Sequence, residues 1–261
     1  MEMYFMNIDE ACSSHEKLLS EGCLNRTNGY PNEDKRQESL AAYVLLTYAI
    51  KDKFNDAVIP LDISWTEEGK PYLKTFKRIP GYPKPCCKKR CSKDKGIEET
   101  ECERAHDAER ECRDKAKVFF SISHSDKFVV VCLSDKEIGV DIEKVTDVNP
   151  SLSRKLIHRN NKEAYEYSDD KSKILLENWC LKEAYYKCSG KIKPSSSTPI
   201  ETYNIFKDIY VIDKHNYGFI KYFNDYCMAL VTKDIVSIEK SESFMVDKGK
   251  IECLISSSIA H

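Results

Sequence analysis

Hydrophobic positions along the chain follow two periods, one typical of strands and the other typical of helices. From short apolar and β-branched runs, strands are predicted at residues 2–8, 59–65, 118–123, 127–133 and 138–145. A helix is predicted over residues 33–54, where one helix face carries Leu40, Val44, Leu45, Tyr48 and Ala49. The first half of the chain therefore combines strands with a long helix.

The second half repeats this combination. A helical pattern over residues 150–190 is broken near residues 168–170, and strands are predicted beyond it at residues 203–206, 209–213, 219–223 and 226–231. Because both halves hold helix and strand, the predicted fold class is α+β, with two subdomains meeting near residues 134–138. We place an N-terminal subdomain at residues 1–134, a C-terminal subdomain at 138–235 and a C-terminal tail at 236–261.

Residues 82–117 differ in composition from the rest of the chain. More than half of them are charged, and Ile97 is their only aliphatic residue larger than Ala. Such a segment cannot bury a core, so we interpret it as a surface insertion in the first subdomain. It also holds five cysteines and His106, which raises the alternative of a zinc or iron–sulfur site. The spacing lacks paired C-x₂-C knuckles, and we favour an insertion without metal.

Composition narrows the function classes. The chain has 261 residues, with 41 basic and 43 acidic side chains and a net charge of −2, so it lacks the basic surface needed for bulk nucleic-acid binding. No apolar run approaches the roughly 20 residues that span a bilayer. The N-terminus has no basic region before its apolar stretch, which argues against a secretory signal. The twelve cysteines are therefore interpreted as reduced thiols, and a cytoplasmic location is expected.

Two acidic residues stand two apart on a predicted strand. In the sequence Gly139–Glu143, Asp141 and Glu143 point to one face while Val140 and Ile142 point into the core. Two carboxylates this close repel each other unless a cation or a proton neutralises them, and Mg²⁺ suits such oxygen ligands. The plainer alternative is a solvated strand face.

A second group lies on the predicted helix that ends near residue 190. Leu176, Cys180, Glu183 and Lys187 share one face, so two charged residues continue an apolar stripe. They predict a carboxylate and an ammonium that project into a cleft, where they would share a phosphorylated ligand. The alternative is an ordinary surface pair at i and i+4.

A third group, Ser121–Ser125, places hydroxyls around His124 near a strand end, where they could donate to phosphate oxygens. A lone histidine is more often structural, and this alternative also remains.

Together these segments resemble a known family. Gly69-Lys70-Pro71, Ser121–Ser125, Gly139–Glu143 and Trp179–Lys187 follow one another as in the 4′-phosphopantetheinyl transferases, and the length is similar to the monomeric surfactin-synthetase-activating (Sfp) type. The resemblance covers roughly residues 60–81 and 118–231. It implies two similar subdomains related by a pseudo-twofold axis, with the active site between them, and a monomer.

The resemblance also implies an activity and its residues. The enzyme would transfer the phosphopantetheine arm of coenzyme A to a serine of an apo acyl or peptidyl carrier protein, releasing adenosine 3′,5′-bisphosphate. Mg²⁺ would be held by Asp141, Glu143 and Glu183. Coenzyme A would contact Lys70, Pro71, Ser123, His124, Lys187 and Lys182. The general base would be Glu143, metal-bound water or Glu163.

One position departs from the family pattern. Relatives place a basic residue just before a small-Leu-Leu stretch, whereas here Glu38 precedes Ser39-Leu40-Ala41-Ala42. Arg36 or Lys35 is therefore expected to bind the 3′-phosphate of coenzyme A. Two other functions stay open, a different Mg²⁺-dependent phosphoryl enzyme such as a phosphohydrolase, and a non-catalytic metal-binding module built on the cysteine-rich insertion.

Overall fold

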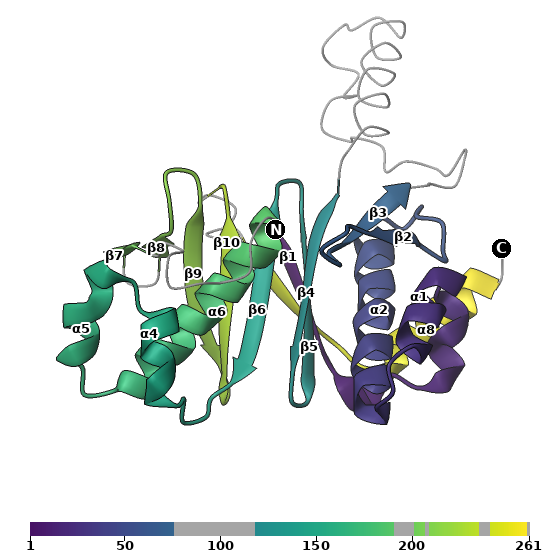
Figure 1. The fold of residues 1–261 in the computed structure, drawn as a ribbon. Coiled ribbons are helices and arrows are strands. Elements are labelled where there is room, and N and C mark those ends of the chain that lie inside the picture. Colours follow the sequence, from purple (N-terminus) through teal and green to yellow (C-terminus); the bar gives the residue numbers. More distant parts are fainter. Residues whose placement is uncertain (76–117, 191–200, 207–208, 235–240, 260–261) are drawn as a thin grey trace, which may run out of the picture.

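The computed structural model describes residues 1–75, 118–190, 201–206, 209–234 and 241–259 (Figure 1). The charged insertion expected at residues 82–117, with its five cysteines, lies outside the described residues. Within them the expected α+β class is confirmed, because two sheets are each covered by a long helix. No helix in these ranges has the length and apolar character of a membrane span.

The first sheet has the strand order β11-β1-β5-β4. Its strands are β1 (Glu2–Asn7), β4 (Phe119–Ser125), β5 (Phe128–Ser134) and β11 (Glu242–Val246). The helices beside it are α1 (Glu21–Asn28), α2 (Glu33–Lys53) and α8 (Lys248–Ile259), with the short 3₁₀ helices η1 (Ile8–Glu10) and η2 (Ser13–Leu18). A separate small sheet pairs β2 (Asp62–Trp65) with β3 (Pro71–Thr75).

The second sheet has the order β6-β10-β9-β8-β7. Its strands are β6 (Ile138–Lys144), β7 (Glu201–Phe206), β8 (Ile209–Val211), β9 (Tyr217–Phe223) and β10 (Tyr226–Thr232). Helix α6 (Lys171–Ser189) covers it, and η4 (Pro150–Leu152), α4 (Ser153–Leu156), η5 (Arg159–Asn161) and α5 (Lys162–Glu166) precede α6 in the chain. The helical pattern expected over residues 150–190 is thus divided more finely than its spacing indicates.

Both long helices have ends that the sequence specifies. The Asn32 side chain accepts hydrogen bonds from the amides of Asp34 and Lys35 and so caps α2. The Asp170 side chain caps α6 in the same way by accepting from the amide of Lys173 at 2.9 Å. Helix α6 ends at Ser189 and is followed by the capping residue Gly190, whose φ of +65° is the left-handed conformation that glycine adopts easily.

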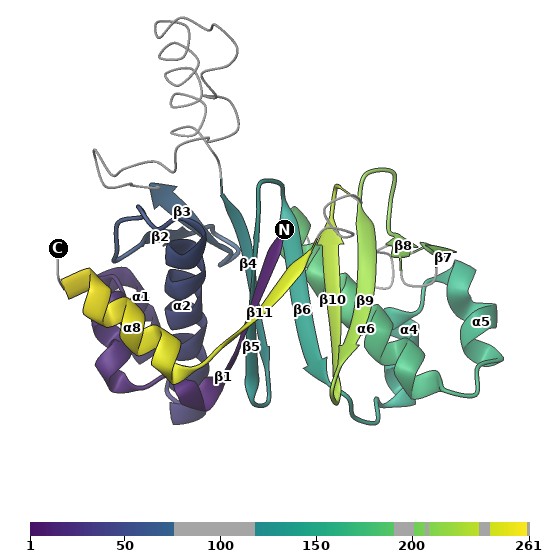
Figure 2. The same ribbon diagram turned by 180° about the vertical axis from the view of Figure 1, so that it is seen from behind.

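The core forms three layers of apolar contact, and β5 contributes to two of them. Val129 and Val131 face α2 and share a cluster with its buried residues, among them Leu45. Val130, on the opposite face of β5, joins Ile142 of β6 in a cluster between the two sheets. A third cluster lies between α6 and the outer face of the second sheet. The cluster between the two sheets therefore joins the two halves, which lie side by side in Figures 1 and 2.

The expected C-terminal tail at residues 236–261 is corrected by the structure. Residues 242–246 form β11, which pairs parallel with β1, and α8 packs against the first sheet through Ile251 and Ile255 (Figure 2). Four of the five β11 residues are exposed, so the segment lacks the buried alternation that marks a strand in a sequence. The chain therefore returns to its first half after completing the second sheet.

Candidate active site

Helix α6 lies directly against β6 at Gly139. A Cβ atom on Gly139 would lie 1.8 Å from the carbonyl oxygen of Ala184 and 2.6 Å from the amide nitrogen of Cys188. Because only glycine permits this backbone approach, it explains why a glycine precedes the two carboxylates of the strand. The close packing brings α6 side chains beside those of β6.

A ladder of serine hydroxyls joins the edges of the two sheets. Ser121, Ser123 and Ser125 alternate along β4, and each Oγ accepts a hydrogen bond from a β6 amide. The donors are Val140 at 3.0 Å, Ile142 at 3.3 Å and Lys144 at 3.1 Å. These hydroxyls therefore fix the register between β4 and β6, a structural role that the sequence pattern did not reveal.

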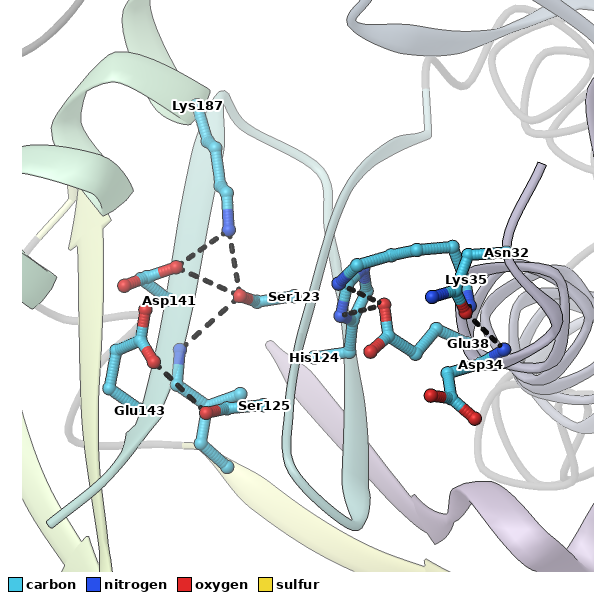
Figure 3. Close-up of polar contacts among 11 residues, drawn as sticks. Asn32, Asp34, Lys35, Glu38, Ser123, His124, Ser125, Asp141, Glu143 and Lys187 are labelled. Atoms are coloured by element: carbon cyan, nitrogen blue, oxygen red, sulfur yellow. Dashed lines mark hydrogen bonds and ion pairs between the residues drawn. The ribbon is translucent and has the colours of Figure 1, made fainter. Parts of the chain in front are cut away.

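Asp141 is almost fully buried, with 4% of its surface exposed, and is held by two donors. Its Oδ1 accepts from Ser123 Oγ at 2.8 Å and from Lys187 Nζ at 2.7 Å (Figure 3). The Lys187 ammonium also donates to Ser123 Oγ at 2.7 Å. The second oxygen, Oδ2, is buried and has no hydrogen-bond partner among the described residues. A buried carboxylate oxygen without a donor is rare and suits a ligand or ion.

Both oxygens of Glu143 are engaged. Oε2 accepts from Ser125 Oγ at 2.9 Å, and Oε1 accepts from the indole Nε1 of Trp179 at 3.2 Å. Burial raises the pKa of Glu143, the charge of Asp141 raises it further, and the two hydrogen bonds oppose this shift. Donors from β4 and α6 thus hold this carboxylate in one orientation.

Glu183 lies one helical turn before Lys187 on α6 and is half-buried. No hydrogen bond or ion pair to Glu183 occurs within the described parts of the chain. Burial raises its pKa, and the nearby charge of Asp141 adds to this effect. The three carboxylates predicted as metal ligands therefore share one region and repel one another.

The carboxylates have the chemistry of a hard divalent cation site, although the site is not preassembled. No group of three or more His, Cys, Asp or Glu side chains within the described residues is already arranged around a common ion position. Instead, the ammonium of Lys187 supplies the positive charge beside Asp141. The all-oxygen donor set and the partnerless Oδ2 of Asp141 fit Mg²⁺, and the ligand set Asp141, Glu143 and Glu183 stays a prediction.

A pocket of about 410 Å³ adjoins this cluster and reaches across both halves of the molecule. Four of the expected coenzyme A contacts line it, namely Lys70, Pro71, His124 and Lys187. Further lining residues come from α1, α2, the β2–β3 turn and β4, and they include Arg26, Lys35, Glu38, Tyr43 and Trp65. Ser123 lies beside the pocket in the Asp141 cluster rather than on its wall.

Lys70 connects the β2–β3 turn to the end of α6. Its Nζ donates to the carbonyl oxygen of Cys188 at 3.1 Å, and burial lowers its pKa. Gly69 just before it has a φ of +87°, which favours glycine over other residues. The Gly-Lys-Pro sequence therefore forms a turn that closes one side of the pocket.

Lys182 lies elsewhere than expected. It is fully buried, and its Nζ donates to the carbonyl oxygen of Lys155 at the end of α4, at 3.3 Å. Burial lowers the pKa of Lys182 to about 8. Consecutive residues of a helix point in different directions, so Lys182 leaves α6 on another side than Glu183. It does not line the pocket. Its contact holds α4 against α6.

Arg36 and Glu163 also lie outside the pocket wall. The Arg36 guanidinium donates to the carbonyl oxygen of Tyr30 at 2.8 Å and pairs with Glu33. Of the two residues expected at a 3′-phosphate, Lys35 lines the pocket and Arg36 does not. Glu163 is exposed on the short helix α5.

The sequence pattern did not predict a group of aromatic and cationic side chains on the pocket wall. Arg26 lies over the ring of Trp65 at 5.2 Å, and the Trp65 indole donates to the hydroxyl of Tyr43 at 3.1 Å. The three residues come from α1, β2 and α2, so no local spacing connects them. A Trp at the end of a predicted strand, just before a Gly-Pro turn, was the only available signal.

Comparison with known proteins identifies the part of the chain that carries this cluster. Residues 137–231 match the profile of the 4′-phosphopantetheinyl transferase superfamily, and this segment contains Asp141, Glu143, Glu183 and Lys187. The resemblance expected from the sequence is thereby confirmed over this segment.

Three curated bacterial proteins share part of this sequence. The 4′-phosphopantetheinyl transferase gsp of Aneurinibacillus migulanus is 32% identical over 76 residues, which cover 28% of this chain and 32% of that protein. The 4′-phosphopantetheinyl transferase ffp of Bacillus subtilis is 30% identical over 99 residues, or 35% and 41%. The 4′-phosphopantetheinyl transferase Sfp of Bacillus subtilis strain 168 is 26% identical over 93 residues, or 33% and 38%. The matches span less than half of the length of each relative.

Proposed function

We propose that the chain acts as a 4′-phosphopantetheinyl transferase, because residues 137–231 match that superfamily. It moves the phosphopantetheine arm of coenzyme A to a serine of an apo acyl or peptidyl carrier protein. The serine oxygen bonds to the phosphorus next to the pantetheine, and the pyrophosphate P–O bond breaks. Adenosine 3′,5′-bisphosphate leaves with the electron pair, and the serine proton passes to a base.

One observation carries the proposal. The Lys187 ammonium lines the pocket and also donates to Asp141, so the pocket and the group of carboxylates meet at a single side chain. Phosphoryl transfer needs mainly positioning and charge neutralisation, and this arrangement offers both. Lys187 would neutralise charge on the transferring phosphate, while Lys70 and His124 would line the path of the nucleotide.

Asp141, Glu143 and Glu183 would hold Mg²⁺ at this junction. When bound, the ion supplies positive charge next to the pyrophosphate. The partnerless Oδ2 of Asp141 supports this assignment from within the structure.

Glu183 is our proposed proton acceptor for the carrier serine. Glu143 was the first expectation, but both of its oxygens already accept hydrogen bonds. Glu163 is exposed on α5 and does not line the pocket. Glu183 has raised basicity through burial and neighbouring charge, and within the described residues its oxygens accept no hydrogen bond.

The experiment mixes the protein with an apo carrier domain, coenzyme A and Mg²⁺, and follows the carrier by intact-protein mass spectrometry. We expect a mass increase of one phosphopantetheine arm, absent when the carrier serine is replaced by alanine. A phosphohydrolase would instead cleave coenzyme A and leave the carrier mass unchanged. A protein that leaves both unchanged would favour the metal-binding module, whose cysteines at 82–117 lie outside the described residues.

We also propose that the chain works in the cytoplasm as a monomer. One chain supplies both sides of the pocket, from α1, α2, β4 and the β2–β3 turn on one side and from α6 on the other, which supports a monomeric active unit. Cysteines 12, 23, 132, 180, 188, 227 and 253 are free thiols, in keeping with a reducing compartment. Sedimentation of the active protein measures its oligomeric state. An active dimer whose separated protomers are inactive would contradict the monomer.

A further inference from the structure

A second charged cluster lies on the other face of β4 from the Asp141 group. Ser123 and His124 are consecutive and therefore point to opposite sides of the strand, as Figure 3 shows. His124 Nδ1 lies 3.3 Å from Glu38 Oε2, and Lys35 Nζ lies 2.6 Å from the same oxygen. Glu38 and Lys35 come from α2, and all three side chains line the pocket.

Glu38 places a negative charge on the side of the pocket that α2 lines. Burial lowers the pKa of His124, and the charge of Glu38 opposes this shift. The Lys35 ammonium is paired with the Glu38 carboxylate, so these two charges offset each other. The other cations on the pocket wall are Lys187 and Lys70, each also hydrogen-bonded within the protein, and Arg26 of α1. At α2, by contrast, the carboxylate that pairs with the ammonium itself lines the pocket.

The free oxygen of Glu38 also has a chemical preference. Oε2 accepts a hydrogen bond from Lys35 Nζ and lies 3.3 Å from His124 Nδ1, whereas Oε1 accepts no hydrogen bond within the described residues. With 17% of its side chain exposed, this carboxylate is poorly screened by solvent. A phosphate beside it would be repelled, while a hydroxyl could donate a charge-assisted hydrogen bond. Acidic residues recognise ribose hydroxyls in dinucleotide sites for the same reason.

The geometry of the proposed reaction determines which part of the bound nucleotide lies beside Glu38. The pyrophosphate must lie near Lys187 and the carboxylates, so the nucleotide extends into the pocket toward α2. The ribose follows directly after the pyrophosphate, and its 3′ position bears a phosphate in coenzyme A and a hydroxyl in dephospho-coenzyme A. These two compounds differ only at the group that a carboxylate would tell apart.

We infer that Glu38 is a specificity-determining residue that lets this pocket accept dephospho-coenzyme A at least as well as coenzyme A. This inference rests on the proposed transferase function. Glu38 accepts the ribose 3′-hydroxyl through Oε1, and its charge disfavours a 3′-phosphate at the same place. Lys35 holds the carboxylate in position and is not available as an independent phosphate ligand.

The test compares dissociation constants for coenzyme A and dephospho-coenzyme A by titration calorimetry, with Mg²⁺ and without carrier. The proteins are the wild type, Glu38→Gln, Glu38→Lys and the control Glu33→Gln. Glu33 lies on the same helix and is exposed, and its partner Arg36 lies off the pocket wall. Transfer of each compound to an apo carrier is measured in parallel by mass spectrometry.

We expect the wild type to bind dephospho-coenzyme A as tightly as coenzyme A or more tightly. Glu38→Gln should shift the ratio of the two constants toward coenzyme A by about tenfold, Glu38→Lys by more, and Glu33→Gln by less than twofold. A wild type that prefers coenzyme A, or a shift below threefold in Glu38→Gln, would overturn the inference while transfer itself persists. If neither compound binds or is transferred, the proposed function fails as well.

Discussion

Gly139 of β6 and Ala184 of α6 are in direct backbone contact, with no side chain between the strand and the helix. This contact sets the distance between the Asp141 carboxylate on one element and the Lys187 ammonium on the other. In the Gly-Val-Asp sequence, the first residue therefore permits close packing and the second lies in the core, while the third is the metal ligand that we propose.

Gly139→Ala should destabilise the protein strongly, because the added methyl group would overlap backbone atoms that cannot rotate away. Overpacking of this kind costs about 3 kcal/mol or more. Thermal unfolding followed by circular dichroism measures the loss. The matched control is Gly22→Ala on α1, where the new Cβ would lie 3.6 Å from the Trp65 ring and should leave stability unchanged or slightly raised. Equal melting temperatures for both variants would contradict the packing argument.

Glu183→Gln should abolish transfer while leaving the fold intact. Loss of the proton acceptor should lower kcat by about 10²-fold or more. Because burial and Asp141 raise the pKa of Glu183, its charged form weakens the fold above its unfolded pKa, so the variant should melt at an equal or higher temperature at pH 7.5. Glu163→Gln should keep its turnover. The assignment fails if Glu183→Gln turns over like the wild type, or if only Glu163→Gln is inactive.

Ser125→Ala and Ser121→Ala separate positioning of a carboxylate from support of the sheet junction. Each removes one acceptor for a β6 amide, so each should lower stability by about 1 kcal/mol. Only Ser125 also donates to Glu143, so only Ser125→Ala should lower kcat, by about tenfold, with little change in KM for coenzyme A. Equal kcat values for the two variants would show that Ser125 does not orient Glu143.

Lys187→Met should make the protein more responsive to Mg²⁺. The ammonium offsets the buried charge of Asp141, and without it an added cation is the remaining compensation. We therefore expect a lower melting temperature without Mg²⁺ and a larger increase on adding Mg²⁺ than in the wild type. Asp141→Asn, which has no charge to offset, should show almost no increase. A Lys187→Met variant that gains no more than the wild type would argue against cation binding at Asp141.

Because of His15, we expect the free energy of unfolding to decrease as the pH falls into the mildly acidic range. It is fully buried on η2, and its Nδ1 accepts from the Cys12 amide at 3.2 Å. Burial lowers its pKa; the charges of Lys248 and Lys17 lower it further, and Glu252 opposes them. As the pH falls through about 6.5, the unfolded chain therefore binds a proton before the folded protein does, and stability decreases until the folded pKa is passed.

Melting temperatures at pH 7.5 and 5.5 measure this effect. His15→Gln should show a smaller drop between the two pH values than the wild type does. His215→Gln, at an exposed position, should show the wild-type drop. If His15→Gln keeps the full drop, another group carries the pH dependence.

Local pattern was sufficient for the main elements and for the orientation of the β6 side chains. The predicted strand at 138–145 appears as β6, with Val140 and Ile142 in the core and Asp141 and Glu143 on the other face. The helix predicted at 33–54 appears as α2. In both cases the alternation or the apolar spacing reflects burial by immediate neighbours, which a sequence records directly.

Local pattern was not sufficient where partners come from distant segments. Lys182 reads as a site residue beside Glu183, but only the placement of α4 shows that it is buried against Lys155. Glu38 reads as a departure from a family pattern, and its pairing with His124 requires β4 to lie beside α2. The exposed strand β11 carries almost no burial signal, because its neighbour β1 supplies the pairing.

Strand β11 has a consequence for biosynthesis. Residues near 244 lie beside β1, which leaves the ribosome first, while everything between them must still be translated. The first sheet therefore cannot be completed co-translationally before β11 emerges, and until then β1 presents an open edge to other nascent chains. Pairing of the last strand with the first therefore completes the first sheet only after the second sheet has been synthesised.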